Sequence, residues 1–149
     1  IAGLLHDSLE DADSSEERAQ REETIQASFG EVVLGIVRDC TDTGPEESIQ
    51  DKAPWEDRKK KYIAHLSEAS RDSLLVAACD KRHNLHSVVW DVRTQGASVF
   101  DRFKSTPQQQ VWYFESILEK VRPSIPERLA GEIEDLVAAL KKLVADAGL

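Results

Sequence analysis

The sequence predicts an all-α protein, and three observations support that fold class. Several segments carry apolar residues at the three- and four-residue spacing of an amphipathic helix, as in Ile133, Val137, Leu140 and Val144. No segment shows the two-residue alternation of a half-buried strand. Residues that begin or end helices separate these segments, and the chain has no internal repeat or low-complexity tract.

The length and net charge of the chain indicate its domain organisation and argue against some binding functions. The 149 residues suffice for one domain with a single core, and 40% hydrophobic with 32% charged content is ordinary for a globular helical protein. The net charge of -9 argues against binding to nucleic acid or to an anionic membrane through a general basic surface, but it does not exclude a small anion. No apolar run approaches the ~20 residues of a membrane span. Cys40 and Cys79 lie in apolar helical patterns, so we expect two small core residues of a cytoplasmic protein.

The first part of the chain contains a helix end and two further helices. Asp13 or Ser14 caps a largely polar surface helix that runs to about residue 28, and Gly30 follows its end. Residues 41–53 have little apolar content and read as a loop. Between them we expect a helix whose core stripe is Val32, Val33, Ile36, Val37 and Cys40.

Four helices are predicted in the rest of the chain. Pro54 starts one over residues 55–69. Ser70 caps a long helix over 72–94, which Gly96 closes. A further helix spans 107–119. We expect the aromatic residues of this region to be core rather than a base-stacking platform: Phe100, Phe103, Trp112, Tyr113 and Phe114.

The last helix is predicted to begin at a capping box formed by Ser124 and Glu127. Its apolar stripe packs on the domain or on a partner subunit, so a homo-oligomer is possible. The stripe consists of Leu129, Ile133, Leu136, Val137, Leu140, Leu143 and Val144.

The candidate chemistry begins in the first eleven residues, where an apolar run leads into four polar side chains. If these residues are helical, His6 and Glu10 share one face, and Asp7 and Asp11 share the adjoining face. A His beside a carboxylate, with two more carboxylates nearby, supplies the ligands of a divalent metal together with acid and base groups. The alternative, favoured by these residues taken alone, is an amphipathic helix that ends in an acidic turn.

A second candidate segment lies at residues 74–85. Six apolar residues lead to Asp80, which is placed like Asp7 at the end of a buried segment and is followed by cations. Asn84 shares a helical face with Asp80, and Lys81 is a candidate contact to phosphate. The alternatives are that Asp80 caps a helix or pairs with a cation, and that Asn84 is a structural amide.

A basic run at residues 58–61 stands out in this acidic chain. It is either a solvated helix face or a source of cations for substrate phosphates. Arg58 and Lys59 are the candidates for the second role.

Four segments taken in order resemble the HD superfamily of metal-dependent phosphohydrolases: LLHDSLEDAD, FGEVVLGIVRDCTD, WEDRKKKY and AACDKRHNL. Within it, the chain is most similar to the hydrolase domain of the RelA/SpoT (p)ppGpp enzymes and their small stand-alone relatives, from Ile1 to about Tyr113. The resemblance implies an all-helical HD-domain bundle with one divalent ion, usually manganese (Mn2+).

The resemblance also implies a role for each matching residue. The metal ligands are His6, Asp7 and Asp80, and the acidic pair that orients or activates the attacking water is Glu10 and Asp11. Substrate contacts match at Arg58, Lys59 and Asn84, with Lys81 beside them.

One part of the family pattern lies outside this chain. The family's ligand set begins with another His on an earlier helix, after a basic segment that helps to hold the nucleotide. His65, His83 and His86 do not replace that His by motif. We therefore expect residues 1–149 to be a single HD-type domain that lacks its N-terminal helix or helices, as in a piece of a longer protein.

The sequence thus predicts a metal-dependent phosphohydrolase that removes the 3′-pyrophosphate of a (p)ppGpp-type nucleotide. Two alternatives remain open. One is the same chemistry on another nucleotide. The other is a non-catalytic helical module that binds a nucleotide or a protein.

Overall fold

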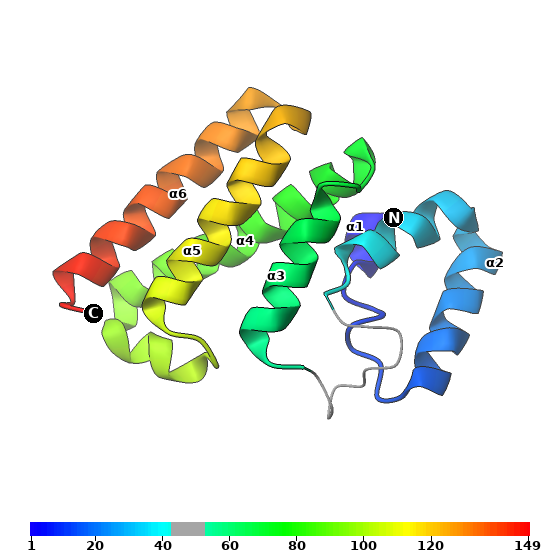
Figure 1. Cartoon of the computed structure of the whole chain (residues 1–149), viewed down its shortest axis with the longest axis horizontal. Helices are drawn as coiled ribbons and strands as arrows, with labels where there is room; N and C mark the ends of the chain where they lie inside the picture. Colours follow the sequence, from blue (N-terminus) through cyan, green and yellow to red (C-terminus); the bar gives the residue numbers. More distant parts are fainter. Residues whose placement is uncertain (43–52) are drawn as a thin grey trace. The chain divides into compact units, whose positions relative to one another are not determined.

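The computed structural model describes residues 1–42 and 53–149 (Figure 1). It divides into two compact units, Ile1–Val76 and Ala77–Leu149. All regular elements among the described residues are helices, with no strand, so the predicted all-α class is confirmed. The loop predicted over 41–53 falls largely on residues 43–52, which lie outside the described residues.

The first unit contains α1 (Ala2–Leu5), α2 (Ser15–Cys40), α3 (Trp55–Leu66) and the start of α4 (Arg71–Gln95), which continues into the second unit. The second unit adds η1 (Ala97–Arg102), α5 (Pro107–Val121), η2 (Arg122–Ser124) and α6 (Glu127–Asp146). No helix in the part of the chain that the structure describes is long and apolar enough to cross a bilayer.

Helix α2 begins and bends where the sequence predicts. The Ser14 hydroxyl accepts a hydrogen bond from the backbone N–H of Glu17 at 3.1 Å, and the Glu17 carboxylate accepts one from the N–H of Asp13 at 2.8 Å. The first bond satisfies an N–H group that the helix itself leaves without a partner, and the second ties the residue before the cap to the first turn. Gly30, with φ 83° and ψ 170°, interrupts the helical backbone, so α2 consists of two segments joined at a bend.

An ion-pair cluster spans this bend. Arg38 donates to the Glu22 carboxylate at 2.6 Å and lies 3.4 Å from Glu31, so it joins the segment before Gly30 to the segment after it. The hydrogen bond that Arg38 donates to Glu22 is the main cause that raises the pKa of Arg38 above its ordinary value. The bend is therefore held by side chains as well as by the backbone.

One core cluster of the first unit is formed mainly by α1, the turns after it and α2. Its buried members are Ala2, Leu9, Ile25, Leu34 and Val37, with Leu5, Val33, Ile36 and Val76 packed against them. The predicted stripe was wrong at Val32, which is 73% exposed, and it missed Leu34, which is fully buried. At 100° per residue, position 32 points away from the face that 34 and 37 share, so the three cannot all face one core.

Helix α4 starts where the sequence predicts, but the expected burial of one of its residues, Cys79, was wrong. The Ser70 hydroxyl accepts from the Ser73 N–H at 3.1 Å, which caps the helix. Cys40 is buried as expected, but Cys79 is exposed. Ala77 and Ala78 form the buried face at that point, and the next residue turns to the opposite side.

In the second unit, α5 and α6 run antiparallel and pack side by side (Figure 1). Thr106 starts α5 through a capping box with Gln109. The expected core aromatics are buried at Phe100, Tyr113 and Phe114, and are partly exposed at Phe103 and Trp112.

The predicted stripe of α6 supplies the buried residues Ile133, Val137, Leu140 and Val144. The predicted capping box at Ser124 was wrong. That residue ends η2, so Pro126 takes the cap position, without a side-chain hydrogen bond.

Alanine substitutions at two glycines of α2, one at the bend and one within the helix, test the assigned bend. Gly30→Ala is expected to lower the free energy of unfolding by about 1–3 kcal/mol, because its φ favours glycine alone. Gly35→Ala is expected to raise it by about 0.5–1 kcal/mol, because Gly35 is helical and a Cβ there meets no atom within 4 Å. Urea unfolding followed by circular dichroism measures both. Equal effects of the two substitutions would contradict the assigned bend.

Candidate functional site

The first candidate segment is a series of turns after a short helix. Helix α1 ends at Leu5, and the N–H groups of Ser8 and Asp11 bond to the carbonyls of Leu5 and Asp7 at 2.9 and 3.0 Å. The expectation that His6 and Glu10 share a helical face is therefore wrong. The Ser8 hydroxyl donates to the Leu5 carbonyl at 2.6 Å, and such local bonds compete with continuation of a helix.

The turn brings His6 and Asp7 together. The His6 Nδ1 atom lies 2.9 Å from the carbonyl oxygen of Gly3, which can only accept, so Nδ1 carries a hydrogen. The other ring nitrogen, Nε2, is buried and lies 3.0 Å from Asp7 Oδ2. Either a proton on Nε2 or a bound cation between the two atoms would satisfy this arrangement.

The donor types of this pair are those that divalent metals bind in proteins, an imidazole nitrogen and a carboxylate oxygen. Their separation of 3.0 Å is also that of an ordinary hydrogen bond between a protonated imidazole and a carboxylate. A hydrogen bond from Nδ1 to a backbone carbonyl is a usual arrangement for a metal-binding imidazole. His6 and Asp7 would therefore be the residues of this turn that hold a divalent ion.

The two other carboxylates of the turn differ in their surroundings. Glu10 Oε1 lies 4.0 Å from Nη1 of Arg58, and the Glu10 side chain is 27% exposed. Asp11 is exposed, and its backbone N–H bonds to the carbonyl of Asp7. Both belong to the same turn as the His6–Asp7 pair.

Arg58 and Lys59, at the start of α3, turn inward onto one carboxylate. Arg58 Nη1 donates to Asp42 Oδ1 at 2.5 Å, and Lys59 Nζ pairs with Asp42 Oδ2. The Asp42 side chain is only 4% exposed. Arg58 Nε also donates to the carbonyl of Ala53 at 3.2 Å. Lys60, by contrast, pairs with exposed Glu56, so the basic run is partly an inward cluster and partly a solvated face.

Sequence reasoning did not single out Asp42. The signal was present, because Asp42 closely follows a buried helical stripe, as Asp7 and Asp80 follow apolar runs. Its role depends on two side chains that are 16 and 17 positions further along the chain, and no local pattern encodes that contact.

A second carboxylate near the end of α2 joins three helices. Asp39 Oδ2 accepts from the Ser73 hydroxyl at 2.6 Å, and Asp39 Oδ1 lies 2.9 Å from His65 Nε2. His65 is near the C-terminal end of α3, whereas Asp42 binds the N-terminal end. Helix α3 is thus attached to the end of α2 at two places.

The remaining predicted residues lie together on α4 in the second unit. Asp80 accepts from Lys81 Nζ at 2.5 Å and from Asn84 Nδ2 at 3.0 Å. The predicted shared face of Asp80 and Asn84 is confirmed. The Asp80 and Lys81 side chains are 10% and 14% exposed, so this pair is largely removed from solvent.

Within either unit, the described residues contain no group of three or more His, Cys, Asp or Glu side chains arranged to hold a metal. His6 and Asp7 belong to the first unit and Asp80 to the second. The three-residue ligand set therefore stays a prediction.

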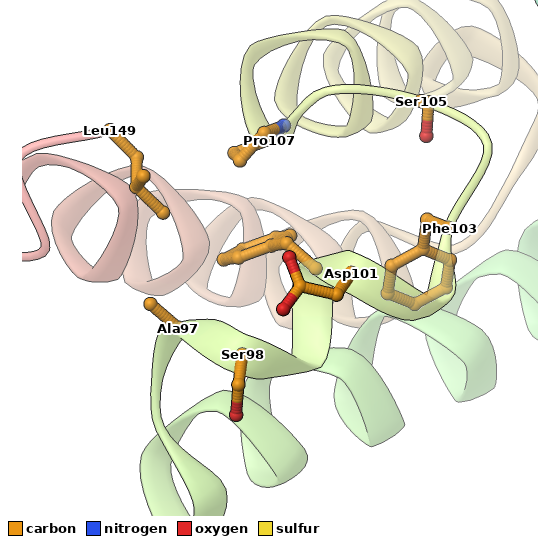
Figure 2. Close-up of a pocket in the computed structure, with 8 residues that line it drawn as sticks. Ala97, Ser98, Asp101, Phe103, Ser105, Pro107 and Leu149 are labelled. Carbon is orange, nitrogen blue, oxygen red and sulfur yellow. The ribbon is translucent and has the colours of Figure 1, made fainter.

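The second unit also contains an open cavity of about 510 Å3, lined by residues of η1, the start of α5 and Leu149. Figure 2 shows the Asp101 carboxylate, Ser98 and Phe103 around it. None of the predicted site residues lines this cavity.

Comparison with known proteins defines the class that this chain resembles. No family model matches the chain. The predicted resemblance to (p)ppGpp hydrolases is nevertheless confirmed by two curated relatives. Both are named guanosine-3′,5′-bis(diphosphate) 3′-pyrophosphohydrolase MESH1.

The relative from Danio rerio is 32% identical over 87 residues, which is 58% of this chain and 41% of that protein. The relative from Drosophila melanogaster is 32% identical over 88 residues, 59% of this chain and 42% of that protein. The chain thus spans about two fifths of the length of the curated relatives that it matches. The crystal structure of lmo0812 from Listeria monocytogenes EGD-e matches with a TM-score of 0.68 and 27% identity, over 91% of this chain and 82% of that one.

The geometry of His6 predicts its tautomer. At about pH 8, where a typical imidazole is neutral, long-range 1H–15N spectra are expected to show His6 with its hydrogen on Nδ1, because the Gly3 carbonyl accepts from that atom. Exposed His83 is the control, and its hydrogen is expected mainly on Nε2. A hydrogen on His6 Nε2 would contradict the proposed availability of that nitrogen to a metal.

Proposed function

We propose that this chain carries out metal-dependent hydrolysis of a (p)ppGpp-type nucleotide and removes its 3′-pyrophosphate. The observation that carries the proposal is the His6–Asp7 pair, whose ligand atoms lie 3.0 Å apart in a turn that also carries Glu10 and Asp11. The proposal is also supported by the similarity of this chain to a relative named for that activity, which is 32% identical over 87 residues.

We propose that His6, Asp7 and Asp80 are the metal ligands, with manganese as the ion. A divalent ion supplies Lewis acidity to a phosphoryl oxygen and makes water a stronger nucleophile near neutral pH. The backbone hydrogen bond of His6 fixes its ring in the orientation that directs Nε2 toward Asp7.

Glu10 and Asp11 are proposed to orient the attacking water and to accept its proton. Both carboxylates lie three or four residues beyond Asp7 in the same turn. Their ionised form is the one that accepts a proton, and proximity to the reacting water is the first requirement for such a base.

Cations and an amide are proposed to bind the substrate. Lys81 and Asn84 both contact Asp80, so a nucleotide held by them would be next to a metal ligand. Lys59 lies beside Asp42 and Arg58 in the first unit. Charge-assisted hydrogen bonds to phosphate are stronger than neutral ones, so these local cations would offset the repulsion between a highly anionic substrate and a chain of net charge -9.

The assay is pyrophosphate release from guanosine 3′,5′-bis(diphosphate) by the natural full-length protein with Mn2+. His6→Ala, Asp7→Asn and Asp80→Asn are each expected to lower kcat/KM by at least about a hundredfold, because each removes a metal ligand. A chelator is expected to abolish turnover, and added Mn2+ to restore it.

His86→Ala is the matched control, because His86 is an exposed imidazole on the same helix as Asp80. It should leave the rate unchanged. Turnover of a different phosphoester would assign the same chemistry to another nucleotide. Nucleotide binding without turnover or metal would favour a non-catalytic module.

A further inference from the structure

The Asp42 carboxylate is held almost completely away from solvent. Its side chain is 4% exposed, and its two oxygens contact two different cations, Arg58 and Lys59. Both cationic side chains are themselves mostly buried, at 11% and 15% exposure. A buried charge is tolerated only when it is paired. Asp42 is therefore neutralised by this contact.

Arg58 is fixed at more than one point. Its Nη1 donates to Asp42 at 2.5 Å, and its Nε donates to the Ala53 carbonyl at 3.2 Å. Because the guanidinium is planar, two such bonds define the position of the whole group. The third group near it is Glu10, whose Oε1 lies 4.0 Å from the same Nη1.

These contacts argue against a role for Arg58 as a phosphate-binding residue. A phosphate that drew Arg58 away would leave the Asp42 carboxylate buried beside Lys59 alone. The fixed guanidinium instead presents a constant positive charge to Glu10, which lies in a turn rather than in a regular helix.

We infer that Asp42 and Arg58 are positioning residues for Glu10. Asp42 holds the guanidinium of Arg58, and Arg58 orients the Glu10 carboxylate in the turn that carries His6 and Asp7. The role of Glu10 toward water rests on the proposed function. The chain of contacts from Asp42 through Arg58 to Glu10 does not.

The kinetic test uses Asp42→Asn, which keeps the side-chain shape and removes the charge. The expected result is a fall in kcat of about 10- to 100-fold with KM changed by less than about threefold, because Glu10 acts in the chemical step. Glu56→Gln is the control, since Glu56 forms an exposed ion pair with Lys60 on the same helix. It should change neither parameter.

A double variant separates positioning from general damage. If Asp42 acts through Glu10, then adding Asp42→Asn to Glu10→Gln should lower kcat by less than about threefold more. Independent, multiplicative losses would overturn the inference. So would a lower KM with unchanged kcat in Asp42→Asn, because that result makes Arg58 a substrate-binding cation that Asp42 restrains.

Arg58→Lys keeps the inference testable if Asp42→Asn does not fold. It retains a cation beside the buried carboxylate but lacks the planar fork that contacts several groups. The same loss of kcat is expected, with a melting curve by circular dichroism to show that the variant is folded. Unchanged kcat in this folded variant would overturn the inference.

A readout without substrate distinguishes this inference from the proposed function. In the wild type, the Arg58 Nε–Hε NMR signal should exchange slowly with water, and Asp42→Asn should abolish that protection and shift the Glu10 carboxyl 13C signal. Glu56→Gln should do neither. Absence of turnover in the wild type ends the proposed function, whereas an unchanged Glu10 signal in Asp42→Asn overturns the positioning role.

Discussion

The attachment of helix α3 to the end of helix α2 is the constraint on which the first half of the candidate site depends. Asp42 binds Arg58 and Lys59 near the N-terminus of α3, and Asp39 contacts His65 near its C-terminus. The buried residues of α3 are Arg58, Tyr62 and Leu66, so its attachment combines these polar contacts with two large side chains that are buried. The position of Arg58 beside Glu10 follows from this attachment.

The burial of each ion pair decides how much stability is lost when one partner is removed. The Asp42 side chain is 4% exposed, whereas Glu56 and its partner Lys60 are about half exposed. An exposed pair contributes about 0–1 kcal/mol, since water screens it and side-chain entropy opposes it. Removing one partner of a buried pair costs several times more, because the other charge is left without compensation. Although the chain is acidic overall, Arg58 and Lys59 form a small buried cluster of cations around Asp42.

Patterns local in the chain were good predictors of this fold. Ser14, Ser70 and Thr106 start helices through side-chain bonds to residues three positions on, and Gly30 and Gly96 adopt positive φ where helices bend or end. The misassignments have different causes. Val32 and Cys79 point away from the buried faces of their helices, and which face is buried is decided by distant residues. The helix was continued beyond Leu5, where local hydrogen bonds form turns instead.

The sequence by itself determined the helical class, most helix starts, and the residue types of the candidate site, because helix caps and apolar periodicity act over a few residues. It also placed Asp80 and Asn84 on one face of α4, since i and i+4 positions adjoin in any helix. Only the tertiary structure decided that residues 6–11 form turns, that Asp42 lies between Arg58 and Lys59, and that Arg58 faces Glu10. The contacts of Asp42 and Arg58 join residues far apart in the chain, and because the charges are buried each needs its partner, which no local pattern records.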